Sequence, residues 1–261
     1  MNSSTVEKVT LFSKALAKEM PMLVYLPPSY NDQTFFPVLY FLHGRNGNEN
    51  IMFDVDINNS ADKLVSCGEI APMVIVCPRI ENSRGVNSSA ECKEVPDTNG
   101  RIINTGRYED YIIEEVIPFI DKTFNTVKDR KGRFIGGVSG GGHAALHNAL
   151  RHQQMFSKVG GHMPAVELKL EEEDQPYYQD IYGWEKYDPI YIATNNTISL
   201  DMEVYLDAGD KDEGQFYEGC SILHNILRGK GINSQYHLFQ GNHSVEYIKS
   251  NIDKYLKFYG C

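Results

Sequence analysis

The sequence predicts an α/β fold with a mostly parallel central sheet that helices cover on both faces. Short, continuously apolar runs alternate along the chain with longer segments whose apolar residues recur at helical spacing. Glycine-rich turns separate several of these segments, as is typical of parallel strands joined by helical crossovers. A length of 261 residues is usual for one such unit, so we expect a single domain over residues 1–261.

Charge and cysteine content limit the classes of partner and compartment. A formal net charge of −10 argues against nucleic acid and against an anionic membrane surface as partners, because both are negatively charged. The sequence has no apolar run near the roughly 18 residues of a membrane span. Five cysteines without a C-x-x-C pair predict free thiols in a reducing compartment. The amino terminus lacks the features of a secretory signal, so we expect a cytoplasmic protein.

The first part of the chain predicts the beginning of the sheet. Residues 6–20 fit either a helix or two short strands, since their apolar spacing suits both. Residues 23–26, which two prolines follow, and the apolar residues 37–42 predict strands, the second one buried. A glycine-rich loop, residues 43–47, follows the second strand. Loops at the carboxyl ends of buried strands are where α/β sheets place ligand-binding groups.

The next segments predict a helix over residues 57–67 and a buried strand over 71–78. Residues 79–107 are rich in Asn, Ser, Gly and charge, and we expect them to form a surface excursion near the site. Residues 108–124 show apolar residues at helical spacing with acids at the start, which suits the helix dipole.

Residues 134–150 predict a strand, a tight turn and a helix around a G-x-S-x-G motif. Gly137, Ser139 and Gly141 fit this motif, which lifts a serine hydroxyl above the end of a strand. The motif needs small neighbours because the backbone doubles back sharply. The alternative is a glycine-rich turn that only packs a helix closely on a strand.

The carboxyl-terminal half continues the alternation, with strands over 158–164, 202–209 and 235–239 and helices over 216–229 and from His243 to Tyr259. A second insertion, residues 163–200, contains five tyrosines and Trp184. These aromatic residues either line a substrate pocket or pack the insertion onto its own domain. We expect the acidic run of the insertion, residues 171–174, to form a solvated face.

Three chemical groups follow predicted strands in the order serine, acid, histidine. Ser139 comes first, Asp210 or Asp212 next and His243 last, with Asp207 as a further competitor for the acid. This is the order of the nucleophile, acid and base in hydrolases built on a parallel sheet. A serine needs an imidazole to take its proton, and the imidazole needs a carboxylate to hold its tautomer. Spacing alone does not choose among the three aspartates.

Attack by a serine on an ester carbonyl creates an oxyanion, which backbone N–H groups stabilise. We expect these N–H groups from Gly140, directly after Ser139, and from Arg45, in the loop after the first buried strand. The other histidines fall in predicted helices or strands, or in the case of His43 in a loop where it has a structural explanation.

Several ordered blocks of the chain resemble an esterase family that includes S-formylglutathione hydrolases, tributyrin-type esterases, feruloyl and acetylxylan esterases and mycolyltransferases. The likeness spans nearly the whole chain apart from residues 81–105 and 163–200. It implies an α/β-hydrolase fold and a Ser-Asp-His mechanism without metal or cofactor. The blocks are SKALAKEMPMLVYLPPSY, PVLYFLHGRNGNEN, RYEDYIIEEVIPFIDKTF, GGVSGGGHAAL, VYLDAGDKD and GNHSVEYIKSNIDKYLKFY.

The resemblance also bears on single residues. It favours Asp212 as the acid, because the family acid ends a D-x-G-x-x-D segment, and it places the first 25 residues as strand, turn and strand. The chain departs from the family at Gly140, where relatives have a larger residue, and at Arg45, where many have a small one. Arg45 either meets an anionic substrate or points to solvent.

The function that follows is a serine esterase that cleaves small-molecule carboxylic esters of short acyl groups through an acyl-enzyme. The alternatives are an S-formylglutathione-type thioesterase, a feruloyl or acetyl carbohydrate esterase, an acyltransferase with the same triad, and a non-catalytic binding protein on a hydrolase scaffold. Asn242, His243 and Ser244 form a glycosylation sequon, and a glycan there would crowd the histidine, which favours a non-glycosylating compartment. The oligomeric state stays open, a homo-oligomer included.

Overall fold

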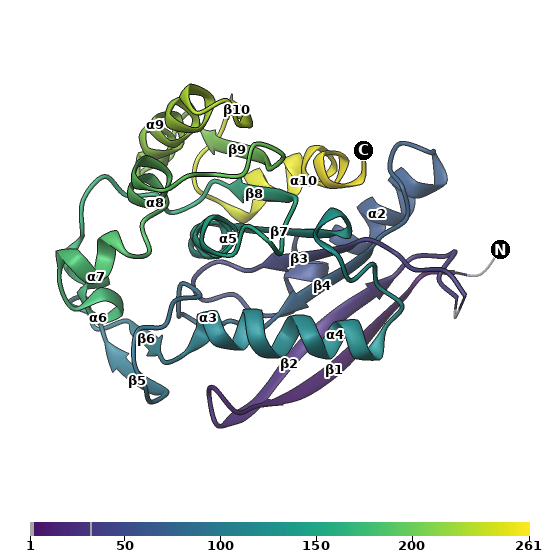
Figure 1. The fold of residues 1–261 in the computed structure, drawn as a ribbon, viewed down its shortest axis with the longest axis horizontal. Helices are drawn as coiled ribbons and strands as arrows, with labels where there is room; N and C mark the ends of the chain where they lie inside the picture. The colour runs from purple at the N-terminus through teal and green to yellow at the C-terminus, as the bar shows by residue number, and fades with distance from the viewer. Residues whose placement is uncertain (1–2, 32) are drawn as a thin grey trace.

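The computed structural model describes residues 3–31 and 33–261 and contains an eight-stranded sheet (Figure 1). The strand order is β1-β2-β4-β3-β7-β8-β9-β10, and pairing is parallel from β4 to β10 and antiparallel at β1/β2 and β2/β4. The predicted, mostly parallel sheet is confirmed. Its strands are β1 (Thr5–Ser13), β2 (Lys18–Leu26), β3 (Val38–Leu42), β4 (Val74–Pro78), β7 (Arg133–Val138), β8 (Lys158–His162), β9 (Glu203–Gly209) and β10 (Asn233–Phe239).

Helices cover both faces of the sheet, as the apolar runs predicted. The helices α3, α4 and α5 lie on one face of the sheet, and the apolar residues of this face form one core with α8 and α9 (Figure 1). The helices α1, α2 and α10 bury a second core on the opposite face. The helices are α1 (Ile51–Asp54), α2 (Ile57–Ser66), α3 (Tyr108–Asp110), α4 (Ile117–Thr123), α5 (Gly140–Arg151), α6 (Gln175–Tyr178), α7 (Ile181–Glu185), α8 (Pro189–Asn195), α9 (Phe216–Gly229) and α10 (Val245–Gly260).

The parallel register brings the carboxyl ends of four strands to one edge of the sheet. Leu42 lies opposite Gly137, Val138 opposite His162, and His162 opposite Asp207. The loops that follow β3, β7, β8 and β9 therefore start side by side. Groups that are far apart in the sequence can meet at this edge.

Residues 5–26 form the antiparallel pair β1 and β2, so the strand, turn and strand arrangement is confirmed and the helix alternative is wrong. The predicted helix over residues 108–124 is confirmed, with a π-helical turn, Tyr111–Val116, between α3 and α4. Among the described residues, the longest and most apolar helices still fall short of what a membrane crossing requires.

Residues 79–107 are a surface excursion only in part, since residues 89–102 are mostly exposed or half-buried while the residues before and after them pack into the fold. The segment forms a second sheet, the hairpin of β5 (Lys93–Pro96) and β6 (Ile102–Thr105), and Ser83, Arg84 and Val86 are buried. A small apolar core joins this segment to the tyrosines of the 163–200 insertion, and Figure 1 shows β5 and β6 beside α6 and α7. The buried part was not predicted, because low apolar content along a segment does not reveal polar side chains that are buried by pairing with another segment.

Candidate active site

Ser139 lies on the sharp turn between β7 and α5, as the motif predicted. Its backbone has φ 52° and ψ −121°, a conformation that costs energy for a residue with a side chain and that is typical of exposed nucleophiles. The flanking glycines are needed for close backbone contact. A Cβ at Gly137 would lie 2.5 Å from the carbonyl oxygen of Gly141, and one at Gly141 would lie 2.3 Å from that of His43.

The structure brings Ser139, His243 and Asp212 into one hydrogen-bonded line. His243 Nε2 lies 2.9 Å from the Ser139 hydroxyl oxygen, and His243 Nδ1 lies 2.9 Å from Asp212 Oδ2. The Asp212 side chain is fully buried, and its other oxygen accepts the N–H of Gly214 at 2.9 Å. The ring of Phe216 meets the His243 ring edge to face at 5.3 Å between centroids. The imidazole is thus held from two sides.

The competing aspartates are engaged elsewhere. Asp210 Oδ1 accepts the N–H of Gly241 at 2.9 Å and so fastens the turn before His243. Asp207 is fully buried, accepts the hydroxyls of Tyr247 and Tyr255 at 2.7 and 2.9 Å, and lies 3.1 Å from His162 Nδ1. Both contribute to local structure, and the distances favour Asp212 as the partner of His243.

Arg45 and Gly140 are adjacent beside the serine. An ideal Cβ on Gly140 would lie 3.9 Å from the Arg45 nitrogen, and a Cβ on Gly44 would lie 3.7 Å from the Ser139 hydroxyl oxygen. Gly140 is the first residue of α5, so its N–H has no partner within the helix. Two backbone N–H groups therefore lie beside the serine, where the sequence predicted an oxyanion hole.

His43 holds the loop that contains Arg45. Its Nδ1–H donates to the carbonyl of Gly44 at 2.8 Å, and its Nε2 accepts the N–H of Ile80 at 3.0 Å. Acceptance at Nε2 requires the neutral ring, because both nitrogens of a protonated imidazole are donors. Burial lowers the pKa of His43 to about 4, which keeps that ring neutral at physiological pH. His43 is therefore a structural residue, as its loop position suggested.

The buried histidines predict a loss of stability in mild acid. Burial lowers the pKa of His43 to about 4 and that of His147 to about 3, whereas an unfolded histidine titrates near 6.5. The unfolded chain binds more protons below pH 6.5, so this stability is present above that pH and is lost as pH falls. Asp188, whose pKa burial raises to about 6, opposes the trend by about 1 kcal/mol.

We expect the free energy of unfolding, measured by urea denaturation, to fall between pH 7 and pH 5, with His43, His147 and Asp188 together contributing about 3 kcal/mol. Burial also lowers the pKa of His143 and of His162, which adds to the fall. His147→Gln removes one titrating ring and is expected to reduce that fall by about 2 kcal/mol. Equal stability at the two pH values would contradict the assignment of these rings as buried and neutral.

Arg45 does not simply point to solvent, because its guanidinium is paired with acidic side chains. It lines both pockets at Ser139, so its contact with an anionic substrate stays a prediction. Its guanidinium donates to Glu173 Oε1 at 3.2 Å and to Asp174 Oδ1 at 3.1 Å. The acidic run is a solvated face only in part: Glu172 is exposed, but Asp174 is buried between Arg45 and Arg84. Ion pairs between segments so distant in the chain leave no pattern in the sequence, and Arg84 and Asp174 were missed for that reason.

Two pockets meet at Ser139. A polar pocket of about 140 Å³ lies toward the two insertions and includes Arg84, Glu167 and Tyr177 in its wall. An apolar pocket of about 300 Å³ lies toward α1 and α10, where Val55, Met163, Val245 and Ile248 contribute. His243 lines the apolar pocket, and Phe216 lines the polar one.

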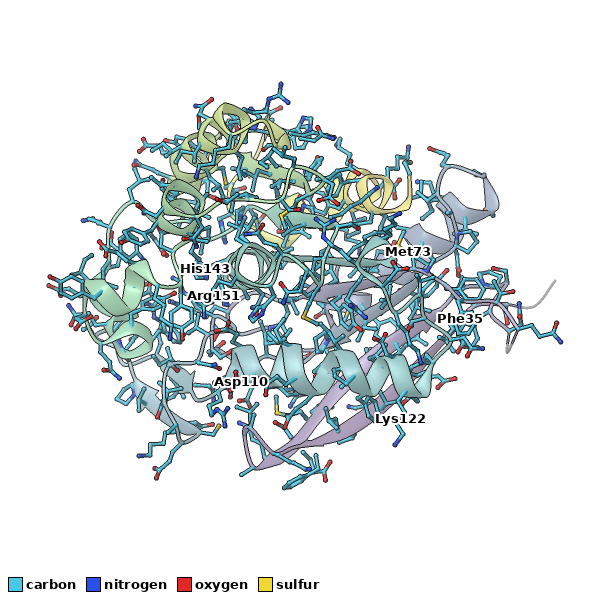
Figure 2. The ribbon with its side chains drawn as sticks, in the orientation of Figure 1. Phe35, Met73, Asp110, Lys122, His143 and Arg151 are labelled. Atoms are coloured by element: carbon cyan, nitrogen blue, oxygen red, sulfur yellow. The ribbon has the colours of Figure 1, made fainter. Side chains whose placement is uncertain are left out.

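The tyrosines of the 163–200 insertion mostly pack it onto the rest of the chain. Tyr178 and Tyr187 are buried against α5, where their rings approach those of His143 and His147 at 6.4 and 5.6 Å. Figure 2 shows His143 and Arg151 projecting from α5 toward this insertion, and Arg151 donates to the carbonyl of Lys186 at 3.2 Å. Tyr177 contributes to the polar pocket. Both interpretations of the aromatic cluster are therefore correct in part.

A mostly parallel sheet with a serine on its strand-to-helix turn defines an α/β-hydrolase. A ferulic acid esterase of known structure has this fold and superposes with a TM-score of 0.84 at 23% identity, covering 100% of this chain and 99% of that chain. The sequence model of the Esterase family, described as "Putative esterase", matches residues 13–259. The chain belongs to this esterase family, and the resemblance drawn from its sequence is confirmed.

Two relatives are similar over much of the chain. An endo-1,4-beta-xylanase/feruloyl esterase from Xylanibacter ruminicola is 28% identical over 61% of this chain, which spans only 22% of that protein. The S-formylglutathione hydrolase of Arabidopsis thaliana is 27% identical over 79% of this chain and 74% of its own length. The relatives thus include, by name, a feruloyl esterase and an S-formylglutathione hydrolase.

Proposed function

We propose that this member of the esterase family is a serine hydrolase that cleaves carboxylic esters of short acyl groups. Ser139 is the nucleophile, His243 the general base and Asp212 the residue that orients His243. The observation that supports this most directly is the continuous line of 2.9 Å contacts from Asp212 through His243 to the Ser139 hydroxyl. A non-catalytic scaffold would have no need for this alignment.

The proposed reaction has two half-reactions. The Ser139 oxygen attacks the ester carbonyl carbon while its proton passes to His243 Nε2, and the resulting oxyanion accepts the N–H groups of Arg45 and Gly140. When the tetrahedral carbon collapses, His243 gives that proton to the leaving alkoxide and an acyl-serine remains. Water, deprotonated by His243, then attacks the acyl carbon. The bond between that carbon and the Ser139 oxygen breaks, His243 returns the proton to the serine, and the acid leaves. Asp212 stabilises the imidazolium in both steps.

The pockets indicate the shape of the substrate. A small polar pocket and a larger apolar pocket meet at the nucleophile, which suits an ester with one compact polar arm and one apolar arm. The room in the apolar pocket also supports a second candidate, an ester with an aromatic or longer aliphatic arm. The five free thiols fit a reducing, cytoplasmic compartment, which we include in the proposal.

Steady-state hydrolysis of p-nitrophenyl acetate, butyrate and octanoate, compared with S-formylglutathione, tests the proposal. We expect turnover of the esters with a preference for the shorter acyl groups. A faster reaction with S-formylglutathione would favour the thioesterase alternative, and product analysis with added alcohols separates a hydrolase from an acyltransferase. Folded protein that turns over none of the four substrates would contradict the proposal.

Narrowing the apolar pocket should change substrate preference. Val245 lies at the pocket wall and is 52% exposed, so Val245→Trp can cover the opening with little strain in the core. We expect kcat/KM for the octanoate ester to fall about tenfold relative to that for the acetate ester, because a long arm loses apolar contact of about 1.4 kcal/mol. Leu238→Trp, on β10 and equally exposed at 52%, is the matched control. An unchanged ratio of the two rates would show that long acyl groups bind elsewhere.

A further inference from the structure

Asp174 joins two arginines at the wall of the polar pocket. It lies in the 163–200 insertion, and its side chain is only 2% exposed. Asp174 Oδ1 accepts from Arg45 at 3.1 Å, and Asp174 Oδ2 accepts from Arg84 at 2.6 Å. The carboxylate thus bridges the loop after β3 to the 79–107 segment. A buried carboxylate between two guanidinium groups is an ion pair that is both strong and directional.

The position of Asp174 is itself constrained. The Arg84 guanidinium is 6% exposed and makes a two-pronged contact with Glu167, at 2.9 and 2.6 Å, in addition to its bond with Asp174. Glu167 and the carbonyl of Ala165, which accepts from Arg84 at 3.3 Å, lie just beyond β8. Because both terminal nitrogens of Arg84 are bound by these partners, Arg84 holds Asp174 at a defined distance from Arg45.

Arg45 connects this anchor to the proposed oxyanion hole. Its guanidinium is bound by the insertion, while its backbone nitrogen lies beside Gly140 at the serine. The next residue, Asn46, has φ 62° and exchanges hydrogen bonds with the side chain of Asn82 at 2.6 and 3.1 Å. The carbonyl of Gly44, in the same peptide unit as the Arg45 N–H, accepts from His43 Nδ1 at 2.8 Å and from the N–H of Gly47 at 3.1 Å. These bonds hold that peptide from within the loop, and the bond to Asp174 holds the Arg45 side chain that extends from it.

We propose that Asp174 is a positioning residue that fixes the Arg45 backbone N–H toward the oxyanion. This inference rests on the proposed function, since it gives Asp174, a residue outside the triad, a role in positioning a group of the same active site. Glu173 is a weaker support, because its side chain is 32% exposed and it also pairs with Arg101. Removing one oxyanion donor costs about 10²- to 10³-fold in kcat, so a misplaced donor should cost about 10- to 100-fold.

The first test is Asp174→Asn, assayed with p-nitrophenyl acetate and with a phenylboronic acid, which forms a tetrahedral adduct with an active serine. We expect kcat to fall about 10- to 100-fold while KM stays within about threefold. The oxyanion is present in the transition state and the tetrahedral intermediate but not in the bound substrate, so substrate binding should change little. The affinity for the boronic acid should fall by a factor similar to that of kcat. Glu172→Gln, on the exposed neighbour, is the matched control and should retain the wild-type values.

The second test asks whether Asp174 acts through Arg45. Arg45→Ala keeps the backbone N–H but removes the anchored side chain, so it should lower kcat as much as Asp174→Asn does. In the double variant the second substitution should change kcat by less than about threefold, since both remove the same link. Arg45→Ala also tests the positioning role if Asp174→Asn does not fold, because the Arg45→Ala variant keeps Asp174 paired with Arg84.

The outcomes separate the two levels of the proposal. Wild-type protein without esterase activity would overturn the proposed function and this inference with it. Active wild-type protein together with an Arg45→Ala or a folded Asp174→Asn variant of unchanged kcat would overturn the positioning role alone. Equal, independent losses in the double variant would also overturn it, because Asp174 would then act without Arg45.

Discussion

Ser139→Ala is expected to abolish ester hydrolysis, with a loss in kcat of at least about 10⁴-fold. Alanine removes the only atom of this side chain that can form the acyl-enzyme. In the native protein His243 Nε2 lies 2.9 Å from the Ser139 hydroxyl, and the variant leaves it no hydroxyl to deprotonate. Residual hydrolysis would come from the remaining binding and oxyanion groups. The measurement is single-turnover and steady-state hydrolysis of p-nitrophenyl acetate.

The fold of Ser139→Ala should persist, because the strained turn depends on the glycines on either side of residue 139 rather than on its hydroxyl. Circular dichroism and thermal unfolding provide that control. A fluorophosphonate probe should label the wild-type protein and leave Ser139→Ala unlabelled. If the variant kept a tenth of the wild-type rate, Ser139 could not be the nucleophile.

Asp212→Asn is expected to lower kcat by about 10³- to 10⁴-fold with little change in KM. The carboxylate accepts from His243 Nδ1 at 2.9 Å, and that bond places the acceptor nitrogen toward Ser139. An amide cannot stabilise the imidazolium, and its NH₂ group would favour the opposite tautomer. The effect is therefore on the chemical step, and pre-steady-state acylation of Ser139 is the measurement that isolates it.

Asp210→Asn is the matched control for Asp212→Asn. Asp210 belongs to the same loop, but its carboxylate accepts the N–H of Gly241 at 2.9 Å, and an asparagine oxygen can accept that bond as well. We expect the control to stay within about fivefold of the wild-type kcat. If Asp210→Asn caused the larger loss, the role of the acid would move to Asp210.

Much of the fold could be predicted because its signals are local. Val38–Leu42 and Val74–Pro78 are continuously apolar, and a strand buried on both faces requires such a run wherever it lies. The glycines around Ser139 likewise meet a steric requirement of the turn itself. Residues 5–26 needed the family resemblance, since their apolar spacing alone fits a helix as well as the observed hairpin.

The sequence by itself determined the class of fold, the place of the candidate nucleophile and the order of the candidate serine, acid and histidine, because each can be read from local motifs in the chain. Only the tertiary structure decided that Asp212 faces His243, that Arg45 pairs with Asp174, and that Arg84 is buried. These contacts join segments of the chain that are far apart, and a charged residue that pairs across such a distance is indistinguishable in sequence from one that faces water. The packing of the two insertions brings Arg84 and Asp174 together, and the parallel register of the sheet brings the loops of Asp212 and His243 together.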